Sequence, residues 1–182
     1  MKNTLFILVA LLTSLITEAQ FIKEKALNVQ IGYAITAPYD TWSNAADDGF
    51  FAQGELILKA ASWVEFRPYA GFIFTNADTN SGEEFSETKA FLLGGKARLR
   101  APIPWIAPYA EIGIGTSIGS FKTYTFFESI DKSGIIYHIP FAFGLELGPD
   151  HNVDIGLAYY FQPTVEQFAG AFAIGLTIPL RN

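Results

Sequence analysis

The sequence contains no cysteine, which excludes disulfide bonds, thiol catalysis and cysteine-ligated metals. Beyond residue 20 it also lacks any apolar run that could cross a membrane as a helix, because such a helix needs about 20 apolar residues. Basic residues are scarce as well: 12 Lys and Arg stand against 18 Asp and Glu, and no basic cluster is evident. This charge balance argues against nucleic acid as a partner.

The first 19 residues have the features of an export signal. Lys2 supplies a positive charge, an apolar run from Leu5 to Ile16 follows, and the small residue Ala19 precedes the expected cleavage before Gln20. The run is too short to span a bilayer, and no cysteine follows it that could accept a lipid. The sequence therefore predicts a signal peptide over residues 1–19 and a single exported domain over residues 20–182.

Eight segments of this domain alternate between apolar and small or polar side chains. In one of them, for example, Ile155 and Leu157 alternate with Asp154 and Gly156. A period of two is typical of strands. The segments cover 27–35, 50–59, 64–74, 91–100, 106–118, 135–147, 153–161 and 171–178. An exported chain that is half apolar and has no membrane helix must close its backbone hydrogen bonds as a barrel in order to enter lipid. The predicted fold is all-β, an eight-stranded antiparallel up-and-down transmembrane β-barrel.

The connections and the aromatic residues predict how this barrel lies in a membrane. Longer connections over 37–49, 76–87 and 120–134 alternate with short turns, although the one after the seventh strand is also fairly short. In outer-membrane barrels the short turns are periplasmic and the longer loops external. Aromatic residues suited to a headgroup layer gather near the strand ends. The expected girdle consists of Trp63, Phe66 and Trp105 at the periplasmic rim, with Tyr33, Tyr137 and Phe161 towards the outer rim.

Two strands open with a related motif. Residues 67–71 read Arg-Pro-Tyr-Ala-Gly and residues 107–111 read Ala-Pro-Tyr-Ala-Glu, and each follows a turn that carries Trp. This opening, which runs into alternating glycine at 113 and 115, resembles the small outer-membrane β-barrel family of Gram-negative bacteria, the OmpA-type barrels. The resemblance covers roughly residues 21–182. It implies an outer-membrane location, with lipid, lipopolysaccharide and the barrel assembly machinery as partners, although the chain ends in Asn182 and not in the aromatic residue common there.

The polar face of the strands would line the lumen. An eight-stranded barrel is only wide enough for side chains to fill it, and unpaired buried charges are costly. Acids and bases should therefore interlock as a plug in the periplasmic half. Hairpin register places Glu65 near Arg98, Lys96 near Glu111, and Lys59 near Glu65 or Arg67. The predicted lumen network comprises Glu55, Lys59, Glu65, Arg67, Lys96, Arg98, Arg100, Glu111 and Glu146. Lumen glycines, at 71, 113, 115, 144 and 156, would leave room for these long side chains.

Few residues indicate catalysis or metal binding. His138 should point into the lumen, with Asp131 and Ser133 in the preceding loop, a set that a lipid-modifying enzyme could use if a hydroxyl lies within reach. A buried structural histidine is the favoured interpretation. His151 lies in a turn at the opposite rim, so the two histidines cannot form a zinc site. The acidic residues Asp78, Glu83, Glu84 and Glu87 are interpreted as a solvated loop, and no cofactor is expected.

These observations favour a structural or adhesive protein of the outer membrane. Exposed aromatic residues in the external loops, around Trp42, 83–85 and 124–127, would contact lipid headgroups, surface glycan or a partner. Three alternatives stay open at this point. They are an enzyme that transfers or removes acyl groups of envelope lipid, a narrow pore, and a soluble exported lipocalin-like barrel with its aromatic residues inside.

Overall fold

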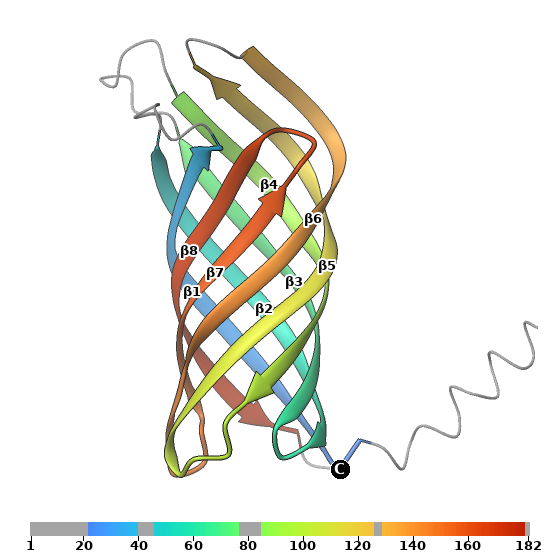
Figure 1. The fold of residues 1–182 in the computed structure, drawn as a ribbon, viewed down its shortest axis with the longest axis vertical. Coiled ribbons are helices and arrows are strands. Elements are labelled where there is room, and N and C mark those ends of the chain that lie inside the picture. Colours follow the sequence, from blue (N-terminus) through green and yellow to red (C-terminus); the bar gives the residue numbers. More distant parts are fainter. Residues whose placement is uncertain (1–21, 40–45, 77–84, 126–128, 181–182) are drawn as a thin grey trace, which may run out of the picture.

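The fold is a closed barrel of eight strands. A computed structural model of the chain describes residues 22–39, 46–76, 85–125 and 129–180. The strands follow chain order: β1 (Glu24–Pro38), β2 (Asp47–Ala61), β3 (Val64–Asn76), β4 (Phe85–Arg100), β5 (Trp105–Tyr124), β6 (Ser129–Gly148), β7 (Val153–Gln162) and β8 (Gln167–Pro179). Each strand pairs antiparallel with the next, and β8 pairs with β1 (Figure 1). The predicted fold class is confirmed. Within the described ranges, no helix is long and apolar enough to cross a membrane.

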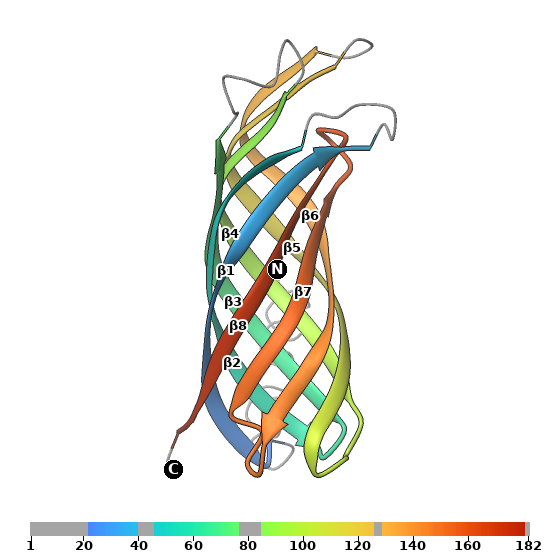
Figure 2. The same cartoon turned by 90° about the vertical axis from the view of Figure 1, so that its left-hand side faces the viewer.

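The strands are strongly tilted. A path that follows register partners from Phe143 on β6 through β7, β8 and β1 to β5 returns to β6 at Ser133, ten residues away. Ten residues at about 3.3 Å, spread over eight strands about 4.8 Å apart, correspond to a tilt of about 40°. This is the tilt expected for a barrel whose interior is filled by side chains, and Figure 2 shows it directly.

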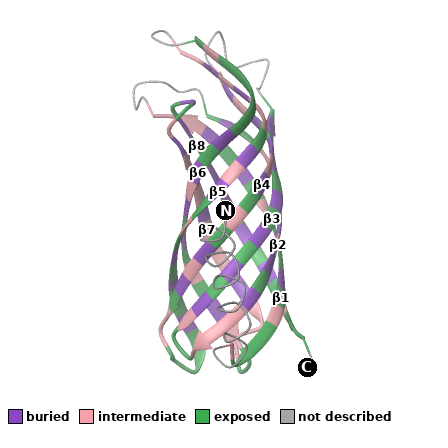
Figure 3. Cartoon of the chain, turned by 90° about the vertical axis from the view of Figure 1, so that its right-hand side faces the viewer, coloured by how far each residue is buried: buried purple, intermediate pink, exposed green. Residues whose placement is uncertain are grey.

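The outward face of the wall is apolar. Phe72, Ile114 and Phe143 are exposed, whereas Arg98 and Glu111 are buried, which is the reverse of a soluble barrel. Along most strands, buried positions alternate with exposed or partly exposed ones (Figure 3). On β1, outward apolar side chains run from Leu27 to Ile35, above the exposed Lys25. From Leu27 to Ile35 the strand rises about 20 Å at this tilt, close to the apolar band of outer-membrane barrels.

The β5–β6 hairpin is longer than predicted. The sequence pattern favoured a loop over 120–134, but β5 and β6 stay paired up to Tyr124 and Ser129, so that only 125–128 connect them. The pattern failed because polarity inverts in this part of the hairpin: Phe121 is buried, whereas Lys122 lies outward and is partly exposed. The hairpin rises well above the shorter β7–β8 hairpin (Figures 1 and 2).

Candidate functional site

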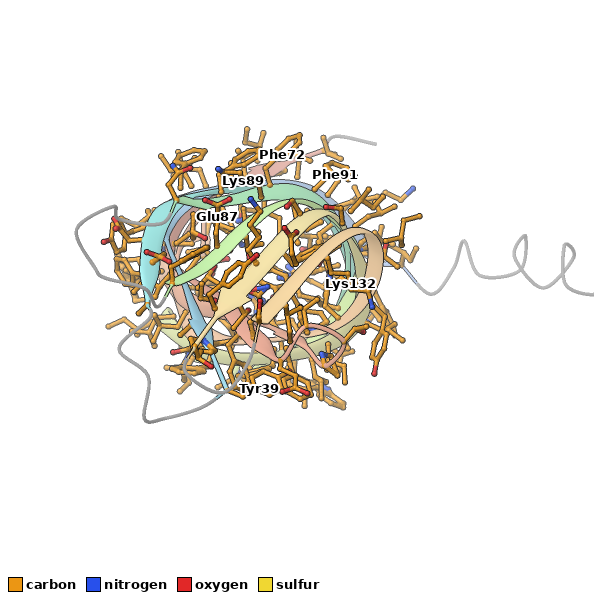
Figure 4. All side chains as sticks on the ribbon, turned by 90° about the horizontal axis from the view of Figure 1, so that it is seen from above. Tyr39, Phe72, Glu87, Lys89, Phe91 and Lys132 are labelled. Atoms are coloured by element: carbon orange, nitrogen blue, oxygen red, sulfur yellow. The ribbon has the colours of Figure 1, made fainter. Side chains whose placement is uncertain are left out.

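The lumen is the most elaborate part of the molecule. Seen down the axis, side chains fill the ring of strands, while others, such as Phe72 and Phe91, lie outside it (Figure 4). In the half of the lumen nearer the short turns, charged side chains from β2 to β7 converge, because each occupies an inward position of the alternation. We term these side chains the charge network: Glu55, Glu65, Arg67, Lys96, Arg98, Arg100, Glu111, Glu146 and Asp154.

Arg67 stands at the centre of the charge network. Its Nη1 donates to Glu55 at 3.0 Å, and its Nη2 donates to Glu65 at 2.7 Å and to Glu146 at 2.9 Å. The guanidinium thus links β3 to β2 and, across the lumen, to β6. With only 1% of the Arg67 side chain exposed, this desolvated charge depends on its carboxylate partners.

Lys96 and Arg98 extend the network around the wall. Lys96 Nζ lies 2.5 Å from Glu55 and 2.7 Å from Glu111. Arg98 donates to Glu111 at 2.6 Å, to Glu146 at 2.7 Å and to Asp154 at 2.8 Å. Every cation of the network therefore has a carboxylate partner, and interior salt bridges are present as predicted.

The predicted register is confirmed, because Lys59 is the Cα partner of Glu65 and Glu65 that of Arg98. The ion pairs nevertheless differ: Lys59 is partly exposed and pairs with Glu24. Glu65 is the register partner of Arg98 but bonds Arg67 on its own strand, because residues two apart share one face of a strand. Arg100 sits below the others, where it bonds Glu146 at 2.6 Å and the backbone oxygen of Ser62 at 3.1 Å.

Two tyrosines that open strands pack against glycines. The Arg98 guanidinium lies 3.5 Å from the ring centroid of Tyr109, a cation–π contact within the lumen. A Cβ at Gly144 or Gly156 would collide with the Tyr109 hydroxyl, and one at Gly115 would collide with the Tyr69 hydroxyl. These glycines therefore leave room for tyrosine as well as for charged side chains.

Two other lumen glycines have a different role. A Cβ at Gly71 or Gly113 would meet the backbone of the neighbouring strand. Glycine at these positions therefore permits a close approach of the strands. The sequence analysis expected these two glycines to make room for long charged side chains, but the nearest atoms belong to the backbone.

His138 lies in the middle of the lumen, above the charge network. Its Nδ1 is 2.7 Å from Ser117 Oγ and its Nε2 is 2.5 Å from the Tyr69 hydroxyl, while Gln162 Nε2 donates to Ser117 at 3.2 Å. Ser117 and His138 are both fully buried. His138 therefore bonds the hydroxyl of Ser117 and not that of Ser133, which is exposed on β6. Because Ser117 and His138 are buried in the lumen, a lipid substrate cannot reach them.

The upper half of the lumen contains an apolar cluster that the sequence pattern did not predict, together with buried polar side chains such as Thr36, Thr75 and Gln167. Phe51, Ile73, Leu92 and Ile136 point inward and pack in one cluster with Phe121 and with Val165 of the β7–β8 turn. The sequence did contain a signal for this cluster. Each of the first four residues has an apolar residue on both sides, as Ile73 has in Phe72-Ile73-Phe74. In such a run, alternation leaves one apolar side chain on the inner face.

A cavity of about 250 Å³ opens into the lumen at the end of the barrel that carries the short turns. It is lined by Lys59, Arg100 and His151 among others, and reaches Arg67. Beside Glu111 and Asp154 there is a further void of about 10 Å³, room for about one water molecule. His151 lies at the mouth, with Nε2 3.0 Å from the Ile103 oxygen. Among the described residues, no group of three acidic or histidine side chains is placed to hold a metal ion.

The predicted girdle residues lie on the outer surface near both ends of the barrel. At the end with the short turns Trp63, Phe66 and Trp105 are exposed, as are Tyr33 and Tyr137 towards the opposite end. Phe161 is only partly exposed.

The outer rim also holds an aromatic cluster at the barrel seam. Tyr39 stacks on Phe161, with ring centroids 5.0 Å apart, and lies 4.6 Å from Phe168. Burial disfavours the phenolate and raises the pKa of Tyr39 to about 12. The Tyr39 amide donates to the Glu166 oxygen at 3.0 Å, so this cluster joins the end of β1 to the β7–β8 turn.

The predicted contact loops are described only at their edges. Trp42, Asp78, Glu83, Glu84 and residues 126–127 lie outside the described residues. Phe85 and Tyr124 belong to β4 and β5, and their rings pack 4.7 Å apart. Glu87 is paired with Lys89 at 3.1 Å on the outer surface (Figure 4).

Comparison with known proteins identifies the fold. Neither a protein-family model nor a curated protein matches the chain. Among solved structures, neisserial surface protein A is 12% identical, with a TM-score of 0.63 over 86% of this chain and 97% of that one. The outer membrane protein OprG from Pseudomonas aeruginosa is 10% identical, with a TM-score of 0.50 over 87% and 98% of the two chains. The chain therefore has the fold of the small eight-stranded outer-membrane barrels.

Proposed function

We propose that this protein is an integral outer-membrane barrel that does not conduct and that acts at the cell surface through its outer end. The observation that carries the proposal is the combination of an apolar outer wall, a filled lumen and a hairpin that projects above the wall. The resemblance of the fold to neisserial surface protein A, a protein named for its surface location, supports this function.

The outer wall supports insertion into a bilayer. From Leu27 to Ile35 the outward face of β1 is apolar over about 20 Å, and the neighbouring strands continue this band. The export signal proposed for residues 1–19 and the rim aromatics at Trp63 and Trp105 fit the same location.

The filling of the lumen argues against a pore. The charge network occupies the periplasmic half, and the outer half holds the apolar cluster around Phe51 and Ile136 together with buried polar side chains such as Thr75 and Gln167. A conducting path would need charged or polar groups that stay hydrated along its whole length. The buried position of His138 and Ser117 likewise leaves an envelope-lipid enzyme without an accessible site.

A labelling experiment tests the orientation of the barrel in the membrane. Because the chain has no native cysteine, the introduced cysteine is the one thiol that can react. Single variants Ser133→Cys, on the outer hairpin, and Asp150→Cys, in the turn between β6 and β7, are expressed in Gram-negative cells. A membrane-impermeant maleimide should label the first in intact cells and the second only after the outer membrane is permeabilised. Equal labelling of both in intact cells, or of neither before lysis, would contradict the proposal.

Heat-modifiable gel migration tests insertion separately. Detergent-extracted barrel should migrate differently before and after boiling, because a folded barrel resists unfolding by the detergent. A variant that lacks residues 120–134 should still show this difference in gel migration, but it should no longer bind its partner at the cell surface.

A further inference from the structure

The two strands of the β6–β7 pair differ in length. β6 has 20 residues and β7 has 10, and their pairing stops at Ile139 opposite Phe161. Residues 129–138 of β6 are paired with β5 on one side. On the other side, none of the described residues pairs with them. This leaves a free strand edge of about 30 Å at the outer end of the barrel.

Pro140 establishes which amides of β6 face this edge. The β5–β6 ladder lacks the two pairs at Gly113 and Ile114, opposite Pro140 and Ile139, while Pro140 keeps its pairing with Tyr160 on β7. A proline lacks an N–H donor, so its nitrogen must face β5, where the ladder is interrupted. Successive residues face opposite sides of a strand in its hydrogen-bonding plane.

The register with β5 is unshifted from His138 to Ser129, so the same assignment holds along the whole edge. Five residues therefore direct their backbone N–H and C=O groups away from β5, towards the free side. They are Ser129, Asp131, Ser133, Ile135 and Tyr137.

Apolar side chains flank the free edge. Ile135 is 72% exposed and Tyr137 is 52% exposed on the outer side. On the inner side, Ile136 is buried in the upper lumen cluster and Ile130 packs against that cluster. A strand added here would extend the β6–β7 ladder directly above the β7–β8 turn and could cover Ile130 with its inward side chains.

We propose that this edge binds an extended polypeptide segment of a partner at the cell surface, by strand addition to β6. This inference rests on the proposed function and names the class of partner. A row of backbone donors and acceptors is matched by another backbone, and apolar flanking side chains select a segment with apolar residues at alternate positions.

A second copy in the same membrane does not fit the edge. Both copies would have β6 descending towards the periplasm at a tilt of about 40°, so a two-fold axis along the membrane normal makes the two strands cross at about 80°. Strands in a ladder run nearly parallel or antiparallel. The occupant is therefore a mobile or extended segment, which can align with the tilted edge.

The test uses purified full-length protein in lipid nanodiscs and a fluorescent nine-residue peptide of alternating Thr and Val. Saturable binding is expected by anisotropy, with slower hydrogen exchange at the amides of Ser133 and Ile135. A control peptide has the same side chains, but its ladder-facing amides carry N-methyl groups and cannot donate hydrogen bonds. This control should bind at least tenfold more weakly.

Two variants of the chain complete the test. Ser133→Pro removes one edge-facing N–H and leaves the ladder to β5 intact, so peptide affinity should fall about tenfold, whereas Ser133→Ala should bind like wild type. The heat-modifiable gel shift verifies that both variants are folded. Absence of peptide binding, or equal binding by the N-methylated peptide or by Ser133→Pro, would overturn strand addition. The labelling pattern at Ser133→Cys and Asp150→Cys would still decide the proposed function.

Discussion

Arg67 Nη2 and Glu146 Oε1 meet at 2.9 Å although 79 residues separate them in the chain. Arg67 lies on β3 and Glu146 on β6, which are not neighbours in the barrel, so this bond crosses the lumen. Together with the bonds of Arg98 to Glu146 and Asp154, it ties opposite walls of the barrel into one unit.

Arg67→Met should destabilise the barrel by about 3–5 kcal/mol, because it removes a buried cation that Glu55, Glu65 and Glu146 share, and Arg67 is the one ion-pair partner of Glu65 among the described residues. The measurement is urea unfolding in lipid vesicles, followed by tryptophan fluorescence. Lys59→Met is the matched control at the partly exposed rim and should cost no more than about 1 kcal/mol. Equal losses in the two variants would contradict a special role for the lumen bonds.

The lumen should block ions in two layers. In planar-bilayer recordings the wild-type protein should show no steady current. Arg67→Ser alone should stay closed because the apolar cluster remains, and Phe51→Ser alone because the charge network remains. Only the double variant should conduct. A steady wild-type current would refute the plug.

His138→Ala should lower the free energy of unfolding by about 2–3 kcal/mol, since it leaves the Ser117 and Tyr69 hydroxyls buried without their partner. Ser133→Ala, at an exposed position of β6 away from His138, should change it by less than about 0.5 kcal/mol. Mass spectrometry of lipid A from cells with either variant should match wild type. Loss of an acyl modification in His138→Ala cells would indicate an enzyme instead.

Lipid depth can be tested on one strand with one residue type. Ile112 and Ile106 both face outward on β5, 65% and 53% exposed, and lie near the middle and the periplasmic edge of the apolar band. Ile112→Arg should cost about 2–4 kcal/mol in vesicles, and Ile106→Arg about 0–1 kcal/mol. Equal costs for the two variants would mean that the wall does not face lipid.

The period of two is sufficient to predict the strands and their number, because a one-sided apolar pattern such as Val153-Asp154-Ile155-Gly156 has few other interpretations. The inward side of Arg98, Glu111 and Asp154 follows from the same pattern. Alternation along the strands therefore predicts nearly all of the charged side chains that line the lumen.

The partners of the ion pairs and the ends of the strands are harder to predict from the sequence. Lys59 has a carboxylate as register partner on each side, Glu24 on β1 and Glu65 on β3, and it pairs with Glu24. The upper part of β5–β6 escapes the pattern because its polarity inverts at Phe121 and Lys122, where the wall leaves the apolar band. Outside lipid, apolar side chains turn inward, as they do in a soluble sheet.

The closed lumen also has a consequence for the cell as a whole. If the barrel does not conduct, as we propose, the contact between Arg67 and Glu146 across its axis helps to keep it closed to solutes. The number of copies in the envelope would then have no effect on how leaky the envelope is.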